Sequence, residues 1–473
     1  MTRASAMLVT LWVACAVGGW AFTSVTLTAL APLFLLPLPI LLVRRRDGDR
    51  WRPIDPFEPI WLASGLYGFT YLLVPALAAD RPEDFASLEG YLDSPPNAWQ
   101  AATWVCAMGF LALMYAYFGP PGRVLARALE GVSRQDSDKG VAYLAGGFFL
   151  LGCTAVGAAL VINRGFSLPV QELLSGGLRD ATVQSFSGRG YLTVGFALLA
   201  LAVPCAALWA CETPHRRKWV TVGVMCAIAL LLLGAVIGSR ILALGIPVGT
   251  LAVIHYRYRR IPTLGVGAGV LTLAVAAVLI SAARGTGSIA DPIAAIGTLG
   301  LTLDGFAFLV NAIARVDDFL WGSTIAEDLV FTYLPRALWE EKPVIFGYVA
   351  AQEEIAPGLY ADFLGRATYP SGVLAEGYVN FGVAGSLLGA AAVGALSRGL
   401  FVSARHGKAA YCLLLLAWLE ANMVNLFRGV GFLAPQLVLT AIVLAPLLLG
   451  QRYSRSPAEH GVTAKRVGQK TQT

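Results

Sequence analysis

The chain has 473 residues, of which 57% are hydrophobic and only 14% are charged. Soluble domains carry about 25% charged residues, so this composition excludes a soluble enzyme and leaves no room for a separate soluble domain. The net charge of +6 does not require a nucleic-acid partner, because the cytoplasmic loops of membrane proteins are usually basic.

Apolar runs of about 20 residues predict membrane-spanning helices, and the chain contains about twelve such runs. In chain order they cover residues 6–24, 27–43, 57–78, 98–118, 141–163, 190–211, 219–238, 241–256, 262–283, 371–397, 409–427 and 432–450. The first run resembles a signal peptide, but the second follows at once and favours an uncleaved helical hairpin. We therefore predict an all-α, polytopic membrane protein with about 12 transmembrane helices.

The domain organisation follows from these runs. Residues 1–450 form a single membrane domain, and residues 284–370 form one long extracytoplasmic loop with interfacial helices between spans 9 and 10. Residues 451–473 form a polar, basic tail that we predict to be disordered and cytoplasmic. One segment leaves the number of spans open, because residues 297–314 are apolar enough to cross the membrane. We favour a helix that lies at the outer interface or re-enters the membrane.

Lys and Arg residues predict the orientation. Most of them fall on the inside if both termini are cytoplasmic. The loop Ala79–Asn97 carries several carboxylates and only one basic residue, Arg81, as an external loop would.

Several patterns that can signal chemistry do not do so here. The seven cysteines lie within or at the ends of apolar runs without a CxxC pair, which favours packing over disulfide or metal binding. The acidic triplets at 47–49 and 136–138 lie in short basic loops without an α/β domain, so we interpret them as solvated loop. All four histidines fall on the predicted cytoplasmic side, and we expect no metal site.

Cations on the predicted outer side are more informative. Arg240 lies in the turn between two spans, where it serves either as an interfacial anchor or as a bidentate contact to phosphate oxygens. Arg189 lies similarly at the outer end of a span. In the segment YLPRALWEEKP, Arg336 pairs with Glu340 four residues on or contacts an anion.

Further cations and one carboxylate complete the candidate site. Lys342 and Arg366 add positive charge in the long loop, which begins at Arg284. A cluster of such cations would suit a diphosphate. Glu376 opens the next span and shares a helix face with Asn380, four residues on. Its carboxylate is either paired with a cation or placed to accept a proton.

With these residues the chain resembles the oligosaccharide repeat-unit polymerases of bacterial surface polysaccharides, the Wzy type. The resemblance covers roughly residues 160–400. It rests on the segments at 178–195, 238–240, 255–260 and 335–343 and on EGYVNFGVAG at 376–385. The sequence EGYVN departs from the more usual pattern of the family at that helix start.

The resemblance implies an extracytoplasmic glycosyltransferase of the bacterial cytoplasmic membrane that needs no metal or cofactor. Its substrate would be an oligosaccharide repeat linked to undecaprenyl diphosphate, and its partners would be the lipid bilayer and the chain-length regulator and flippase of the same pathway. Glu376, Arg336 and Arg240 would be catalytic. The substrate-binding residues would be Arg366, Lys342, Arg284, Arg189, Tyr378 and Asn380. The alternatives are a ligase that moves lipid-linked glycan to another acceptor and a flippase or other transporter.

Overall fold

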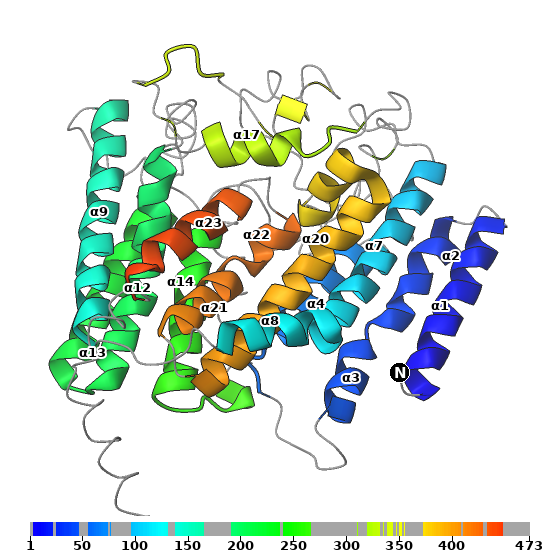
Figure 1. The fold of residues 1–473 in the computed structure, drawn as a ribbon, viewed down its shortest axis with the longest axis horizontal. Coiled ribbons are helices and arrows are strands. Elements are labelled where there is room, and N and C mark those ends of the chain that lie inside the picture. The colour runs from blue at the N-terminus through cyan, green and yellow to red at the C-terminus, as the bar shows by residue number, and fades with distance from the viewer. Residues whose placement is uncertain are drawn as a thin grey trace, which may run out of the picture.

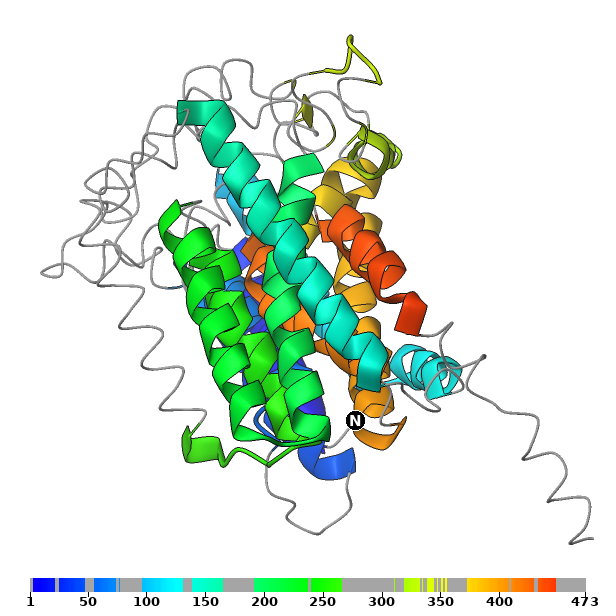
Figure 2. The ribbon, with the colours of Figure 1, turned by 90° about the vertical axis from the view of Figure 1, so that its left-hand side faces the viewer.

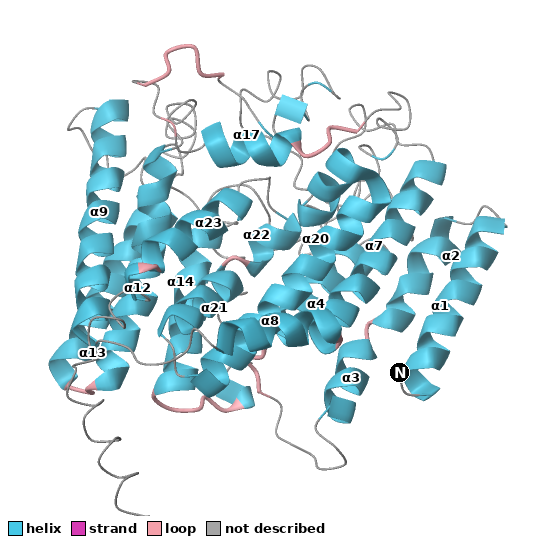
Figure 3. Cartoon of the chain, viewed as in Figure 1, coloured by secondary structure: helices cyan, strands magenta, loops and turns pink. Residues whose placement is uncertain are grey.

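The computed structural model describes most of the predicted membrane domain. The described residues are 3–21, 25–46, 55–73, 76, 96–130, 138–164, 191–236, 240–265, 310, 319–331, 334, 338–343, 347, 350, 351, 354, 372–407, 410–428 and 433–447. Among them all regular structure is helical, as Figure 3 shows. The tail at 451–473, nearly all of 297–314 and much of the predicted loop at 284–370 lie outside the described residues.

The helices stand side by side and most run between the two ends of one bundle (Figure 1). In chain order they are α1 (Arg3–Ala21), α2 (Val25–Leu30), η1 (Ala31–Leu35), α3 (Leu38–Arg46), α4 (Pro59–Tyr67), η2 (Gly68–Leu73), α7 (Pro96–Phe118), α8 (Pro120–Glu130), α9 (Asp138–Arg164), α12 (Tyr191–Glu212), α13 (Arg216–Leu230), η3 (Leu231–Val236), α14 (Arg240–Arg257), α17 (Ser323–Phe331), α20 (Gly372–Gly407), α21 (Ala410–Ala421), α22 (Met423–Arg428) and α23 (Leu433–Leu444). Two short helices mark the ends of the bundle. α17 lies across the upper end in Figure 1, and α8 lies near the lower end.

Small residues let the membrane helices approach each other closely. A Cβ atom added to Gly152 of α9 would lie 2.5 Å from Leu199 of α12, and one added to Gly245 of α14 would lie 2.7 Å from the carbonyl oxygen of Ala421. Such contacts are typical of helices packed within a bilayer, where van der Waals contact between backbones replaces the hydrophobic effect. Figure 2 shows α9 crossing its neighbours at an angle and α17 above the upper end of α20.

Five described helices are long and apolar enough to cross a membrane. They cover Asn97–Phe118, Gly140–Ala158, Val194–Glu212, Arg216–Gly234 and Gly372–Arg405. Shorter apolar helices cover Ala4–Gly19, Leu27–Val43 and Ala410–Ala421. The chain is therefore a helical protein built for a membrane, as the sequence predicts, while the number of 12 spans stays a prediction.

The last of the five candidate spans is interrupted. Phe381 and Gly382 have non-helical backbone angles, and Gly382 has a φ of 64°. The hydroxyl of Ser386 donates to the carbonyl oxygen of Leu374 at 2.6 Å. These two residues would lie about 18 Å apart along a straight helix, so the chain must reverse between them.

The reversal makes α20 a hairpin with a short arm (372–380) and a long arm (383–407). The arms are held against each other by glycines, because a Cβ on Gly377 would lie 2.5 Å from the carbonyl carbon of Gly385. The long arm measures about 37 Å and can span alone, whereas the short arm of about 14 Å cannot. The sequence predicts a single span at 371–397. It does not reveal the reversal, because both arms are apolar and are read as one continuous run.

Candidate functional site

A backbone clasp joins the tip of the α20 hairpin to the segment before α17. We define the clasp as Phe319–Gly322 together with Val379–Gly382. The amide of Leu320 donates to the carbonyl of Val379 at 3.1 Å, and the amide of Trp321 donates to the carbonyl of Asn380 at 3.0 Å. The clasp therefore fixes α17 above the hairpin.

Left-handed backbone marks both halves of the clasp. Trp321 has a φ of 47° and is the one non-glycine residue with positive φ that the structure describes. Gly322 and Gly382 also have positive φ, and their faces are covered by the rings of Phe381 and Phe319 respectively. The left-handed conformation costs about 1–2 kcal/mol at a residue with a Cβ, so the surrounding bonds must hold Trp321 in place.

Asn380 supplies many of these bonds. Its side chain is fully buried, its amide nitrogen donates to the hydroxyl of Thr324 at 2.6 Å and to the carbonyl of Glu376 at 2.8 Å, and its amide oxygen accepts from the backbone of Gly322 at 2.9 Å. Both amide protons are thus in use. These hydrogen bonds hold the clasp together, and the substrate contact that the sequence predicts for Asn380 stays a prediction.

Glu376 lies one turn below Asn380 on the short arm. Its Oε1 atom is buried and has no hydrogen-bond partner, and no described cation forms a salt bridge with the carboxylate. The cations that the sequence offers as partners, Arg240, Arg336 and Arg366, have no described side chains, so both interpretations of Glu376 stay predictions. A free carboxyl group inside a helical membrane protein is costly to bury and usually marks a functional site.

Glu376 is one of the residues that line a cavity of about 350 Å³. The walls come from α17, from both arms of α20 and from α21, α22 and α23, and they are almost wholly apolar or glycine. The lining residues are Ile325, Gly372, Val373, Glu376, Gly377, Phe381, Gly385, Leu388, Gly389, Ala392, Val393, Leu396, Trp418, Leu419, Asn425, Leu426 and Leu437. An apolar cavity with a few polar groups is typical of a ligand site.

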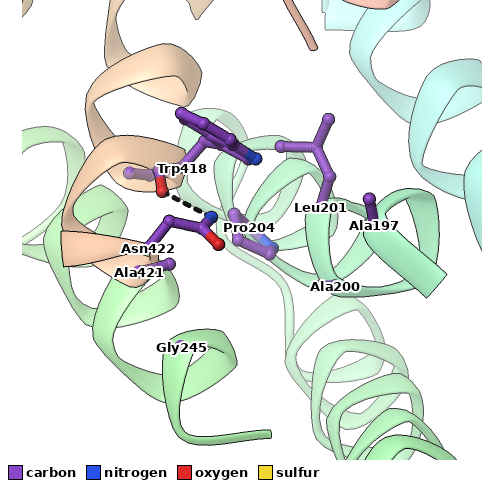
Figure 4. Close-up of a pocket in the computed structure, with 9 residues that line it drawn as sticks. Ala197, Ala200, Leu201, Pro204, Gly245, Trp418, Ala421 and Asn422 are labelled. Atoms are coloured by element: carbon purple, nitrogen blue, oxygen red, sulfur yellow. Dashed lines mark hydrogen bonds between the residues drawn. The ribbon is translucent and has the colours of Figure 1, made fainter. Parts of the chain in front are cut away.

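A second hollow lies between α12, α14 and the C-terminal end of α21 (Figure 4). Its volume of about 20 Å³ is enough for about one water molecule. Its walls are formed by Ala, Leu, Pro and Gly residues together with Trp418 and Asn422. The side-chain amide of Asn422 donates to the carbonyl of Trp418 at 2.9 Å. This hollow is a packing gap and holds no titratable group, so it is not the place of chemistry.

Two acidic residues of α17 contact Gly347. The sequence analysis does not predict them as site residues. The amide of Gly347 donates to Glu327 Oε2 at 2.8 Å, and the carboxylate of Asp328 occupies the space that a Cβ on Gly347 would need. Gly347 also has a φ of 60°. The contact joins α17 to the backbone of Gly347, which is about 20 residues away in the sequence. No local sequence pattern predicts it.

Lys342 and Tyr378 are the remaining predicted site residues with described side chains. Lys342 is 2% exposed, and its ammonium donates to the carbonyl of Leu334 at 2.8 Å, so it helps to order the loop that carries it. The ring of Tyr378 is half-buried and contacts that of Phe319 edge-on, with the ring centres 6.4 Å apart.

The predicted arginine cluster lies largely outside the described residues. Arg240 begins α14, but its side chain is not described. The others, Arg189, Arg284, Arg336 and Arg366, lie outside the described residues altogether. Their role as diphosphate ligands stays a prediction.

The opposite end of the bundle holds a separate group of buried charges. Nε2 of His255 lies 3.2 Å from Asp55 Oδ1, and the hydroxyl of Tyr117 donates to Glu58 Oε1 at 2.8 Å. Burial alone raises the pKa of Asp55, but the hydrogen bond and charge of His255 more than offset it and hold the pKa below its ordinary value. Arg398 adds a guanidinium 3.7 Å from Glu58.

Neither group of charges resembles a metal centre. In the described part of the chain, no three His, Cys, Asp or Glu side chains come together as metal ligands would. No protein-family model, curated protein or solved structure matches the chain. The function must therefore be inferred from the site itself and from the resemblance noted in the sequence.

Proposed function

We propose that this protein is a membrane glycosyltransferase that joins lipid-linked oligosaccharide repeats into a surface polysaccharide. The observation that carries the proposal is the unpaired carboxylate of Glu376 beside an apolar cavity of about 350 Å³. An isoprenoid chain needs apolar walls, and a sugar hydroxyl needs a base. The cavity offers both within a few residues of the short arm.

The proposed step is the transfer of a glycan from one undecaprenyl diphosphate to the terminal sugar of another. Glu376 takes the proton from the acceptor hydroxyl, whose oxygen attacks the anomeric carbon of the donor. The bond from that carbon to the diphosphate oxygen breaks, and undecaprenyl diphosphate leaves with the electron pair. Positioned cations stabilise the charge that develops on the leaving group, and Arg240, Arg336 and Arg366 are our candidates.

The orientation is part of the proposal. We place the α17 end outside a bacterial cytoplasmic membrane and both termini inside, because the basic residues then follow the positive-inside rule. Cysteines substituted at Leu338, which is 77% exposed near α17, and at Val124, which is 64% exposed on α8, test it. An impermeant thiol reagent added to intact cells should label the first and not the second; the reverse pattern contradicts the orientation.

A transporter of lipid-linked oligosaccharides is the second candidate. Helices broken within the membrane are common in transporters, and the α20 hairpin is such an interruption. A ligase is the third, and it would share the leaving group but use a different acceptor.

Reconstituted protein decides among the three. Vesicles containing the purified chain receive undecaprenyl-diphosphate-linked repeats without nucleotide sugar, ATP or added metal, and the lipid-linked glycan is analysed by gel and mass spectrometry. We expect a ladder of joined repeats. Folded protein that carries repeats across the bilayer and joins none refutes the polymerase and supports the transporter. A ligase instead attaches repeats to an added acceptor such as lipid A core and forms no ladder.

A further inference from the structure

Trp321 presents a large aromatic ring to the outside of the bundle from a rigid piece of backbone. Its side chain and backbone together are 73% exposed, although its amide is bonded to Asn380 and its φ is 47°. A ring that packs so little does not explain why the chain adopts a left-handed conformation at this position. Such a conformation is usually kept where a side chain must be held in a fixed place.

Phe381 gives Trp321 a partner across the clasp. The ring centres lie 6.4 Å apart at an interplanar angle of 74°, and Phe381 is itself 41% exposed. The ring of Phe381 also covers Gly322, where an added Cβ would lie 3.1 Å from its outermost carbon atom. The two aromatic rings therefore keep a defined angle to each other, with open surface on both.

Phe381 connects this ring pair to the cavity of Glu376. It is one of the residues that line the cavity, and it follows Glu376 by five positions, on the same short arm and its tip. Phe381 thus belongs to the wall of the cavity that Glu376 lines, and the ring of Trp321 lies beside it, with the ring centres 6.4 Å apart. A group resting on the rings would lie next to that cavity.

We propose that Trp321 and Phe381 form a binding subsite for a pyranose ring. The C–H bonds on one face of a pyranose carry small positive charges, and the face of an aromatic ring is negative, so the two attract each other. The proposal rests on the proposed function and adds to it the place of the sugar nearest the base. Aromatic residues also anchor proteins at the membrane interface. However, an anchor needs neither a left-handed backbone nor a place beside the wall of the cavity that Glu376 lines.

The test measures binding of simple sugars to the full chain in lipid nanodiscs, because maltoside detergents themselves carry sugar. The probes are methyl β-glucopyranoside and methyl N-acetyl-β-glucosaminide, and sorbitol serves as a polyol without a ring. Saturation-transfer NMR reports which sugar protons lie against the protein. We expect saturation of the C–H protons on one face of each glycoside and none of sorbitol.

Three variants distinguish a loss of the aromatic contact from a general effect on folding. Trp321→Ala should weaken the binding about three- to tenfold, the range for one aromatic contact, while Trp321→Phe should keep most of it. Tyr143→Ala is the matched control, because Tyr143 is an exposed aromatic residue near the opposite end of the bundle. Unchanged binding in Trp321→Ala, or equal saturation of sorbitol, overturns the subsite.

The remaining outcomes distinguish the subsite from its rival and from the proposed function. If Trp321→Ala leaves the sugar signals unchanged but alters quenching of protein fluorescence by brominated lipids, the residue is a membrane anchor and the subsite is refuted. Sugar binding that depends on Trp321 in a protein that joins no repeats upholds the subsite and refutes the polymerase. Repeats joined at an unchanged rate by Trp321→Ala refute the subsite alone.

Discussion

Asp55 and Glu58 at one end of the helical bundle differ from Glu376 at the other end in the partners of their carboxylates. At the α8 end, Asp55 contacts His255, and Glu58 accepts a hydrogen bond from Tyr117 and lies beside Arg398. At the α17 end, the Oε1 atom of Glu376 has no hydrogen-bond partner, and no described cation forms a salt bridge with its carboxylate.

Under the proposed function, this difference distinguishes structural charges from the catalytic base. A buried carboxylate that keeps its partners is compatible with a stable fold, and breaking such a pair is destabilising. A buried carboxylate without partners destabilises the fold and is usually retained because it has a function. The same comparison extends to the backbone, because all four glycines with positive φ and the one such non-glycine residue that the structure describes, Trp321, lie in the α17 region or in α20.

The largest effect should come from Glu376→Gln, which keeps the shape of the side chain and removes the base. We expect the rate of repeat joining to fall by about 10²–10⁴, the usual contribution of a general base. The thermal stability of the purified protein should not fall, because no partner loses a bond. Normal joining by this variant would show that the unpaired carboxylate is not the base.

Next in size is Gly385→Val, which tests the hairpin that positions Glu376. A Cβ there would lie 2.0 Å from the carbonyl oxygen of Gly377, and backbone atoms cannot move aside as a side chain can. We expect a loss of stability of about 3 kcal/mol, at the upper end for overpacking. Gly146→Ala is the control, because nothing lies within 4 Å of its added Cβ, and it should be neutral or stabilising. Equal melting temperatures of the two variants would contradict the hairpin.

Glu58→Ala should have a smaller effect, of the opposite kind to that of Glu376→Gln. It removes the acceptor of Tyr117 and the carboxylate near Arg398, and we expect a loss of about 1.5–3 kcal/mol. Repeat joining per folded molecule should stay close to normal, because the residue lies at the far end of the bundle. A variant that joins repeats more slowly but keeps the wild-type melting temperature would contradict the structural role of Glu58.

The smallest effect concerns the pH dependence of stability at the α8 end. The pKa of Asp55 is lower in the folded protein than its ordinary value, so its contact with His255 contributes stability above about pH 4 that is lost as the pH falls further. The difference in melting temperature between wild type and Asp55→Asn should therefore shrink below pH 4. A difference that stays constant from pH 6 to pH 3 would show that Asp55 is not held ionised by its neighbours.

The sequence predicts the class of fold because hydropathy is a local property. Apolar runs such as 98–118 and 190–211 coincide closely with α7 and α12. It also selects Glu376, because a carboxylate within an apolar run is conspicuous. It does not predict the reversal at Phe381 and Gly382, because both arms of α20 are apolar. It does not predict the clasp, since the clasp depends on contacts between segments about 60 residues apart, as from Gly322 to Asn380. The hydrogen bonds of Asn380 to Gly322 and Thr324 are not predicted for the same reason, because these partners are distant in sequence.

The short arm of α20 has a consequence for the order in which the protein is assembled. A segment of about 14 Å that contains a carboxylate is too short to be recognised by the translocon as a span. Its first residue, Gly372, packs against the carbonyl of Phe427, which is synthesised later. We therefore expect the short arm to wait at the membrane surface until α21 and α22 have inserted. The carboxylate then enters the bilayer last, into a cavity whose walls are already built.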